Sequence, residues 1–134
     1  MTFRYLLLLL LGLVPRALAE GLPDLGESAQ ASFTALEERR LGDEIMREVR
    51  SDRSYYDDAE ATDYVNALGA RLVSRGADTR QPFEFFLIQE RSINAFALPG
   101  GFIGVHTGLL IAAQSESELA SVVSHEIAHV TQRH

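Results

Sequence analysis

Two helical patterns open the regular part of the chain. Between Leu36 and Val49, apolar residues recur near one side of a helix, and the opposite side is charged and read as a solvated face. The apolar side holds Leu36, Leu41, Ile45 and Val49, and the charged side holds Glu37, Glu38, Arg39, Arg40, Asp43 and Glu44. A second helix is predicted from about Ala59 to Ser74, with Gly76 as its stop signal. Its core side should carry Tyr64, Leu68, Arg71 and Leu72, and both helices should pack against the later part of the chain.

The pattern changes to short extended segments after Pro82. Residues 83–89 are aromatic-rich and β-prone, which predicts a strand that is buried on much of both faces. Further strands are expected near Ile93 to Ala97 and over Phe102 to His106, with Pro99-Gly100-Gly101 as the turn of a hairpin-like connection. Residues 107–113 favour a short helix. Helices on either side of a small sheet indicate an α+β fold.

The last helix has the clearest boundaries at its start. Ser115 and Glu118 fit a capping box, in which the Glu118 carboxylate would reach back to the Ser115 amide. The helix is then expected to run to the chain end, with an apolar stripe of Leu119, Val123, Ile127 and Val130 and an adjacent row of Val122, His125 and His129. His134 is followed by no Gly or Pro stop signal, so we expect the natural protein to continue.

Residues 1–19 are typical of a secretory signal peptide. Arg4 supplies the positive region, Leu6 to Val14 the apolar core and Ala17-Leu18-Ala19 the cleavage site. The alternative is an uncleaved anchor, but the apolar run is about half of the roughly 20 residues that span a bilayer. Cleavage would leave a mobile amino-terminal segment over 20–34 and the amino-terminal part of one globular domain over 35–134. The sequence therefore predicts export from the cytoplasm.

Composition narrows the chemistry. The formal charge is −7 and the 12 basic residues include no Lys, which argues against nucleic acid as a partner. The chain has no Cys, so disulfides, thiolate catalysis and thiolate metal ligands are excluded. Only His and carboxylates remain as protein ligands for a metal.

His125-Glu126-Ile127-Ala128-His129 forms an HExxH motif. At 100° per residue the two His lie about 40° apart and one turn along a helix, so both imidazoles can reach one ion, for which Zn²⁺ is the usual choice. Glu126 lies about 100° from His125, where it could accept a proton from a water that the zinc activates. The alternatives are two solvated His on an exposed helix, or a structural zinc site, which the lack of Cys disfavours.

The third ligand is missing from this motif. A metzincin would carry Gly at position 132 and His at 135, whereas this chain has Gln132. His134 lies about 180° around the helix from His125 and is read as a solvated or supporting residue. Glu116 and Glu118 are better explained by the helix start. The remaining ligand is therefore expected beyond His134, and the 134-residue chain alone should bind zinc weakly and show little or no activity.

Two separated blocks, Asn94 to Leu110 and Glu118 to His134, resemble the HtpX/CAAX-prenyl-protease family of zinc metallopeptidases. The resemblance covers about 35–134 and implies a zincin-like fold of the gluzincin type. It further implies that His125 and His129 are zinc ligands, that Glu126 is the general base, and that a Glu on a later helix is the third ligand.

The resemblance also implies that residues 102–106 line the cleft, where an extended substrate could add a strand to the sheet edge. Asn94, Gly100 and Gly101 fit either turn chemistry or substrate contact, and His106 fits a polar strand end better than a ligand. Some relatives carry carboxy-terminal helical repeats for partner binding.

The sequence thus predicts a zinc-dependent metalloendopeptidase of the bacterial periplasm. We expect it to act in envelope or outer-membrane protein quality control, on unfolded or stalled envelope proteins, with peripheral contact to the outer-membrane assembly machinery. The rival from another class is a non-catalytic periplasmic chaperone or binding module.

Overall fold

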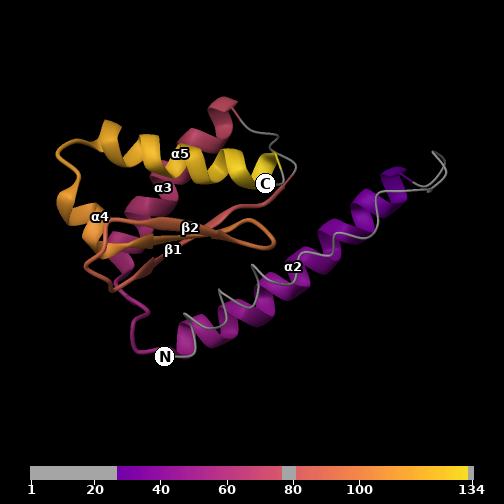
Figure 1. Cartoon of the computed structure of the whole chain (residues 1–134), viewed down its shortest axis with the longest axis horizontal. Coiled ribbons are helices and arrows are strands. Elements are labelled where there is room, and N and C mark those ends of the chain that lie inside the picture. The colour runs from indigo at the N-terminus through magenta and orange to yellow at the C-terminus, as the bar shows by residue number, and fades with distance from the viewer. Residues whose placement is uncertain (1–26, 77–80, 133–134) are drawn as a thin grey trace.

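A small sheet lies between two layers of helices (Figure 1). The computed structural model describes residues 27–76 and 81–132. The helices are α2 (Glu27–Ser51), α3 (Ala59–Gly76), α4 (Thr107–Ala112) and α5 (Glu116–Thr131), and the strands are β1 (Glu84–Ile88), β2 (Ala95–Leu98) and β3 (Phe102–His106). These elements confirm the α+β class. The expected signal peptide and His134 lie outside the described residues.

The sheet has the order β1-β3-β2. β1 runs parallel to β3, with Glu84 opposite Phe102, and β2 runs antiparallel to β3, with Leu98 opposite Phe102. The predicted hairpin is confirmed, and its turn places Gly100 and Gly101 at φ of 86° and 85°, where a side chain would be strained. β3 is therefore the central strand. Because β3 is paired on both sides, a substrate strand cannot add to residues 102–106 themselves and would have to add to another strand of the sheet.

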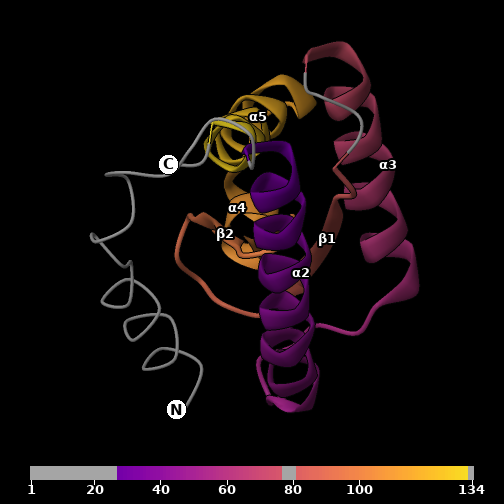
Figure 2. The same cartoon turned by 90° about the vertical axis from the view of Figure 1, so that its right-hand side faces the viewer.

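Each face of the sheet packs against different helices (Figure 2). Because side chains alternate along a strand, Phe85 and Ile103 lie in a core with α3 and α5, whereas Phe86 and Phe102 lie in a second core with α2. All residues of β1 from Phe85 to Ile88 are buried, as predicted for a strand that is covered on both faces.

The helix faces differ in part from the predicted stripes. Leu36 is 67% exposed, because the earlier turns of α2 project from the body (Figure 1). Leu41 is 40% exposed, because the helix directs Gly42, Ile45 and Met46 inward in its place. α2 also begins at Glu27, well before the expected domain start. In α3, Tyr64 is 42% exposed, and Val65 and Gly69 are buried with Leu68. The buried side of α3 is thus centred on Val65, Leu68 and Gly69, about one residue around the helix from the side predicted from the sequence.

The outer edge of β1 is closed by other parts of the chain. The Asn66 side chain donates to the Phe85 carbonyl (2.8 Å) and accepts from the Phe85 amide (3.0 Å). The Tyr56 amide donates to the Leu87 carbonyl at 3.0 Å, and the residues before it continue the pairing. An edge strand that is paired in this way cannot accept another strand.

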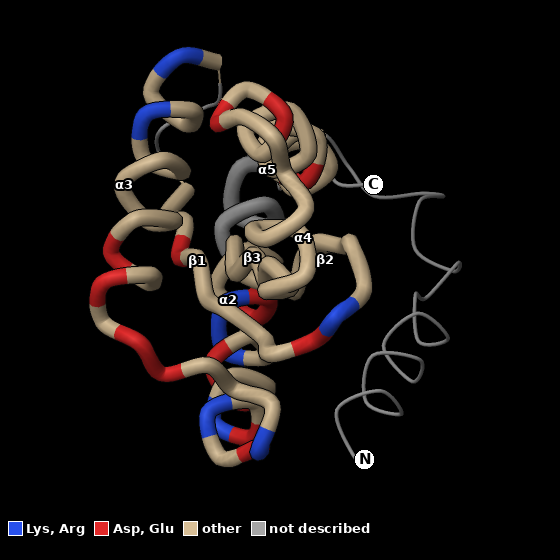
Figure 3. The backbone as a smooth tube through the Cα atoms, turned by 90° about the vertical axis from the view of Figure 1, so that its left-hand side faces the viewer, with Lys and Arg blue, Asp and Glu red and all other residues tan. Residues whose placement is uncertain are grey.

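β2 forms the other edge of the sheet. In the antiparallel ladder the His106 amide donates to the Asn94 carbonyl at 3.0 Å, so the alternate residues Ala95 and Ala97 direct their backbone groups away from β3. Within the described residues no backbone hydrogen bond reaches this outer side. β2 is therefore the open edge, and Figure 3 shows it on the far side of β3 from β1 and α3.

None of the helices in the described ranges is both long and apolar enough to cross a bilayer.

Candidate metal-binding and catalytic site

Helix α5 carries the motif and has a well-formed start. The Ser115 hydroxyl accepts from the Glu118 amide at 3.3 Å, as predicted. The Glu118 carboxylate accepts from the Gln114 amide at 2.9 Å and not from the Ser115 amide, so the predicted reciprocal bond is displaced by one residue. The helix ends at Thr131, with Gln132 as its cap, and so stops before the chain end that the pattern predicted.

Burial of one side fixes the orientation of α5. Leu119, Val123 and Ile127 are 3%, 2% and 5% exposed and pack in the core between α5, α3 and the sheet, as the apolar stripe predicted. His125, Glu126 and His129, which flank this stripe, therefore lie toward the surface of the helix layer. His125 is exposed, whereas Glu126 and His129 are half-buried.

The two imidazoles of the motif converge. Their Nε2 atoms are 2.8 Å apart, and the ring centroids are 4.4 Å apart with the ring planes at 88°. A tetrahedral zinc ion at about 2.0 Å from each nitrogen would hold the two nitrogens about 3.3 Å apart. The observed pair needs to open by only about half an ångström to meet this requirement. The donor set therefore fits a divalent metal ion.

Glu126 lies between the imidazole pair and the buried stripe. Its partial burial raises the pKa of the carboxyl above the usual value, and the neighbouring His129 and His125 oppose this rise. A carboxylate that is partly removed from water is a stronger proton acceptor than a solvated one. This position suits a group that exchanges a proton with a water beside the imidazoles.

The imidazoles face away from α3. Glu116, at the start of α5, forms an ion pair with Arg71 of α3 at 2.5 Å, so this side of the helix faces α3. His125 follows nine residues later, about 180° around the helix, and His129 lies about 220° around it. Because α3 packs against β1 and α5 packs against β2, the side of α5 opposite α3 is the side toward the open edge of the sheet (Figure 2).

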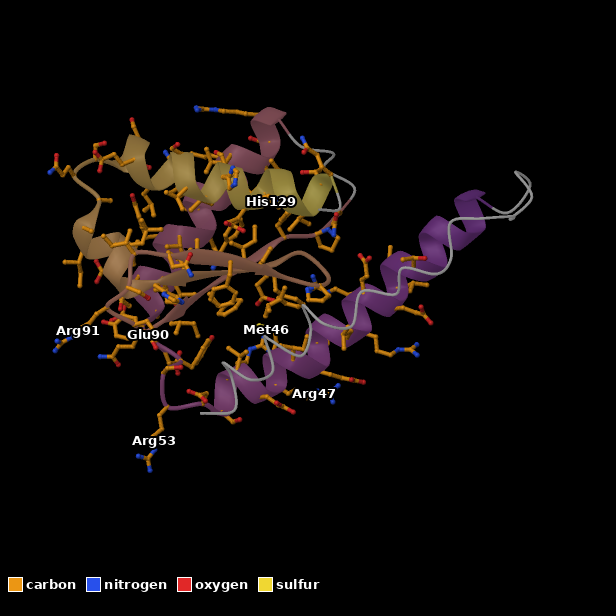
Figure 4. The ribbon with its side chains drawn as sticks, in the orientation of Figure 1. Met46, Arg47, Arg53, Glu90, Arg91 and His129 are labelled. Carbon is orange, nitrogen blue, oxygen red and sulfur yellow. The ribbon has the colours of Figure 1, made fainter. Side chains whose placement is uncertain are left out.

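His106 does not join this pair. It follows Phe102 and Gly104 on the face of the sheet that packs against α2, whereas α5 covers the other face. Its Nδ1 lies 2.7 Å from the Ser92 hydroxyl, and its ring meets the edge of Phe96 at a centroid distance of 5.6 Å. This environment agrees with a polar strand-end residue. Figure 4 shows the same separation, with Met46 of α2 on one side of the sheet and His129 of α5 on the other.

Within residues 27–76 and 81–132, no three His, Cys, Asp or Glu side chains gather where they could hold a metal ion. Glu118 holds the helix start, as expected, whereas Glu116 forms an ion pair with Arg71 that the sequence did not indicate. The pair formed by His125 and His129 is thus the candidate for metal binding among the described residues.

The residues around the hairpin have structural roles in part. Gly100 and Gly101 are required by their positive φ, and a Cβ on Gly101 would lie 2.2 Å from the Pro82 carbonyl oxygen. Asn94 contributes its carbonyl to the β2–β3 ladder.

The side-chain amide of Asn66, which bridges α3 and β1, was not found from the sequence, because one Asn within a helical pattern carries no sign of a distant partner.

Comparison with known proteins defines the class. The model of peptidase family M48 matches residues 57–134, which is more than half of the chain and includes the whole sheet and α5. The chain therefore belongs to peptidase family M48, in agreement with the resemblance to zinc metallopeptidases drawn from its motifs.

Particular relatives refine this assignment. The chain is 45% identical over 116 residues to the beta-barrel assembly-enhancing protease of Escherichia coli (strain K12), covering 87% of this chain and 24% of the relative. A Vibrio cholerae protein that is provisionally given the same name is 50% identical over 113 residues, or 84% of this chain and 23% of the relative. The mitochondrial metalloendopeptidase OMA1 of Schizosaccharomyces pombe is 33% identical over 100 residues, which cover 72% of this chain and 30% of the relative. The chain thus spans about a quarter of the length of the first two relatives.

Proposed function

We propose that this chain is the amino-terminal part of a zinc-dependent endopeptidase domain with a zincin-like active site. The observation that carries the proposal is the convergence of the His125 and His129 Nε2 atoms at 2.8 Å, with Glu126 half-buried beside them. Membership of peptidase family M48 and similarity to metalloendopeptidases support it. His125 and His129 would hold the metal, and a Glu beyond His134 would complete the site.

When bound, zinc would acidify a water and polarise the carbonyl of the peptide bond. Glu126 would accept a proton from the attacking water at a carboxylate oxygen and then donate it to the nitrogen of the leaving amine. Partial burial raises the pKa of Glu126. This favours both proton transfers, because a general acid–base is most effective when its pKa lies near the pH of the reaction.

The open edge of β2 is the proposed docking site for an extended substrate. Ala95 and Ala97 would offer backbone donors and acceptors to an added strand. Both residues are small, so a substrate backbone could approach closely, and the imidazoles of α5 face the same side of the molecule. The outer edge of β1 offers no such site, because Asn66 and Tyr56 occupy its backbone groups.

The biological setting belongs to the same proposal. Two relatives are named for β-barrel assembly, which supports a role in the quality control of envelope or outer-membrane proteins. We propose a periplasmic location, reached through the signal peptide at 1–19, and stalled or unfolded envelope proteins as substrates. Contact with the assembly machinery would be peripheral.

The test compares two glutamates of one helix in the protein extended downstream of His134. Glu126→Gln should retain zinc and cleave an unfolded outer-membrane protein about 10²- to 10⁴-fold more slowly. Glu118→Gln, which removes the same charge two turns away and keeps an oxygen acceptor, should cleave at the normal rate. Cleavage by the unsubstituted protein should stop with a chelator and return with zinc.

Two results would refute the proposal. Undiminished cleavage by Glu126→Gln would exclude this carboxylate as the base. A complete protein that binds no zinc and cleaves nothing, but prevents aggregation of unfolded proteins, would instead establish the non-catalytic chaperone. The 134-residue chain alone should bind zinc weakly and be inactive, because two imidazoles leave the ion short of protein ligands.

A further inference from the structure

The turn of the β2–β3 hairpin is attached to α2 by one arginine. Arg39 Nη1 donates to the Gly100 carbonyl at 2.8 Å. Its guanidinium carbon lies 4.2 Å from the centroid of the Phe102 ring, the first residue of β3. The Asp43 carboxylate, 3.7 Å from Arg39 Nε, orients the group from the next turn of the helix. The Arg39 side chain therefore contacts both Gly100, in the turn, and Phe102, at the start of β3.

The backbone of α2 lies close enough to the turn to constrain it. A Cβ on Gly42 would lie 2.1 Å from the Pro99 carbonyl oxygen, and a Cβ on Gly100 would lie 2.9 Å from the Arg39 Cα. Glycine at both positions lets the helix and the turn touch. The turn thus lies directly against α2, and Arg39 is the side chain that fastens it there.

This attachment acts on the open edge. β2 has β3 as its single strand partner, so its position depends on the ladder, on the packing of α5 and on the two ends of the strand. At the start of β2, the Asn94 carbonyl accepts from the His106 amide. At its end, the chain passes through Pro99 and Gly100 onto α2. Loss of the Arg39 contacts would release this end and leave the strand free to twist.

We propose that Arg39 is a positioning residue, which holds the β2–β3 turn against α2 and thereby sets the direction of the open β2 edge relative to the imidazole pair. The inference rests on the proposed function, in which a substrate strand adds to that edge. The Arg39 side chain is 34% exposed, so water can replace its contacts without loss of the core. Its removal should therefore disturb the edge more than the fold.

The experiment compares neighbouring arginines of α2 in the complete protein. Arg39→Met keeps the length of the side chain and its packing on Phe102 but removes the donor and the charge, and Arg40→Met removes the same charge from an exposed position. With a peptide substrate, Arg39→Met should raise KM about tenfold and leave kcat within about twofold, because the lost contacts affect binding and not the reacting groups. Arg40→Met should match the unsubstituted protein.

Arg39→Lys provides the conservative variant. Lys can donate to the Gly100 carbonyl but lacks the planar group that stacks on an aromatic ring, so its KM should fall between the other two. Amide hydrogen exchange supplies a readout that needs no catalysis. The ladder amides that join Phe96 and Gly104 should exchange about tenfold faster in Arg39→Met, while the amides of α3 keep their rates.

The outcomes separate this inference from the proposed function. A KM and hairpin exchange rates for Arg39→Met within twofold of the unsubstituted values would overturn the positioning role, even if the protein is an active zinc peptidase. An equal loss of protection from hydrogen exchange at all amides would show that Arg39 only supports the fold, and this result would also overturn the positioning role. Faster exchange confined to the hairpin supports the positioning role, and the absence of any chelator-sensitive cleavage would count against the peptidase assignment alone.

Discussion

Replacing Asn66 with Ala tests how the outer edge of β1 is closed. The side chain makes three hydrogen bonds, to the Thr62 carbonyl and to both backbone groups of Phe85, and Phe85 is 3% exposed. The Thr62 carbonyl lies inside α3 and can keep its helical partner. The variant therefore removes the partners of one amide and one carbonyl in a buried strand.

The magnitude depends on the surroundings of these two groups. A buried polar group without a partner costs about 1–3 kcal/mol. A cavity of about 310 Å³, lined by Asn66 and Phe85 among others, adjoins the position and gives water access, so each group should fall at the lower end of this range. Ala also favours a helix over Asn by roughly 0.5 kcal/mol. The net loss should be about 1.5 kcal/mol of unfolding free energy.

Urea unfolding measures this loss. With a slope of about 1–2 kcal/mol per molar, the midpoint should fall by roughly 0.8–1.5 M. Asn94→Ala is the matched control, because its side chain is exposed, and it should change stability by less than about 0.5 kcal/mol. Asn66→Asp should resemble Asn66→Ala at neutral pH, because a carboxylate can accept from the Phe85 amide but cannot donate to its carbonyl. A loss below about 0.5 kcal/mol in Asn66→Ala would refute the view that this amide closes the edge.

Three further predictions address other parts of the chain. Ala97→Pro should fold, because its amide does not join the ladder, but should raise the KM for an extended peptide about tenfold, and an unchanged KM would exclude this edge as the docking site. Gly69→Ala should lose about 1–3 kcal/mol in thermal or urea unfolding because its Cβ would lie 2.2 Å from the Phe85 ring, whereas Gly76→Ala at the end of the same helix, with no atom within 4 Å of its Cβ, should be neutral. Asp52 has a pKa below its ordinary value of 3.8, because its carboxylate accepts from the amide and hydroxyl of Ser54. Its stabilising effect is therefore present above about pH 4 and is lost as the pH falls through the lowered pKa. Asp52→Asn should weaken the acid dependence of the unfolding free energy between pH 5 and pH 2, and an unaltered profile would contradict this assignment.

The features predicted well from the sequence are those set by neighbours along the chain. The 100° step of a helix brings His125 and His129 together, and it needs no knowledge of the rest of the fold. The Ser115 cap, the two glycines of the turn and the β-prone residues of β1 are likewise local signals.

The features that were predicted wrongly depend on distant parts of the chain. The extended pattern of Phe102 to His106 indicates a strand but says nothing of how many neighbours that strand has, so its central place in the sheet was not predicted. Leu36 matches the apolar side of a helix, yet the turn that carries it has no surface to cover. Arg39 lies in a run of charges that the helical pattern assigns to solvent, and its partner Gly100 is 61 residues away. Such contacts are visible only in three dimensions.

The place of β3 in the sheet also sets an order on folding. β1 and β2 are made first, yet each has β3 as its strand partner, and they do not pair with each other. A chain that leaves a ribosome or a translocation pore amino end first would therefore carry two unmatched strands until Phe102–His106 emerges. The appearance of β3 lets the ladder and the core against α2 form, but the core on the other face still lacks Leu119, Val123 and Ile127 of α5. The unfinished sheet therefore keeps one apolar face uncovered until the last helix has emerged, and during that interval the chain is most open to aggregation.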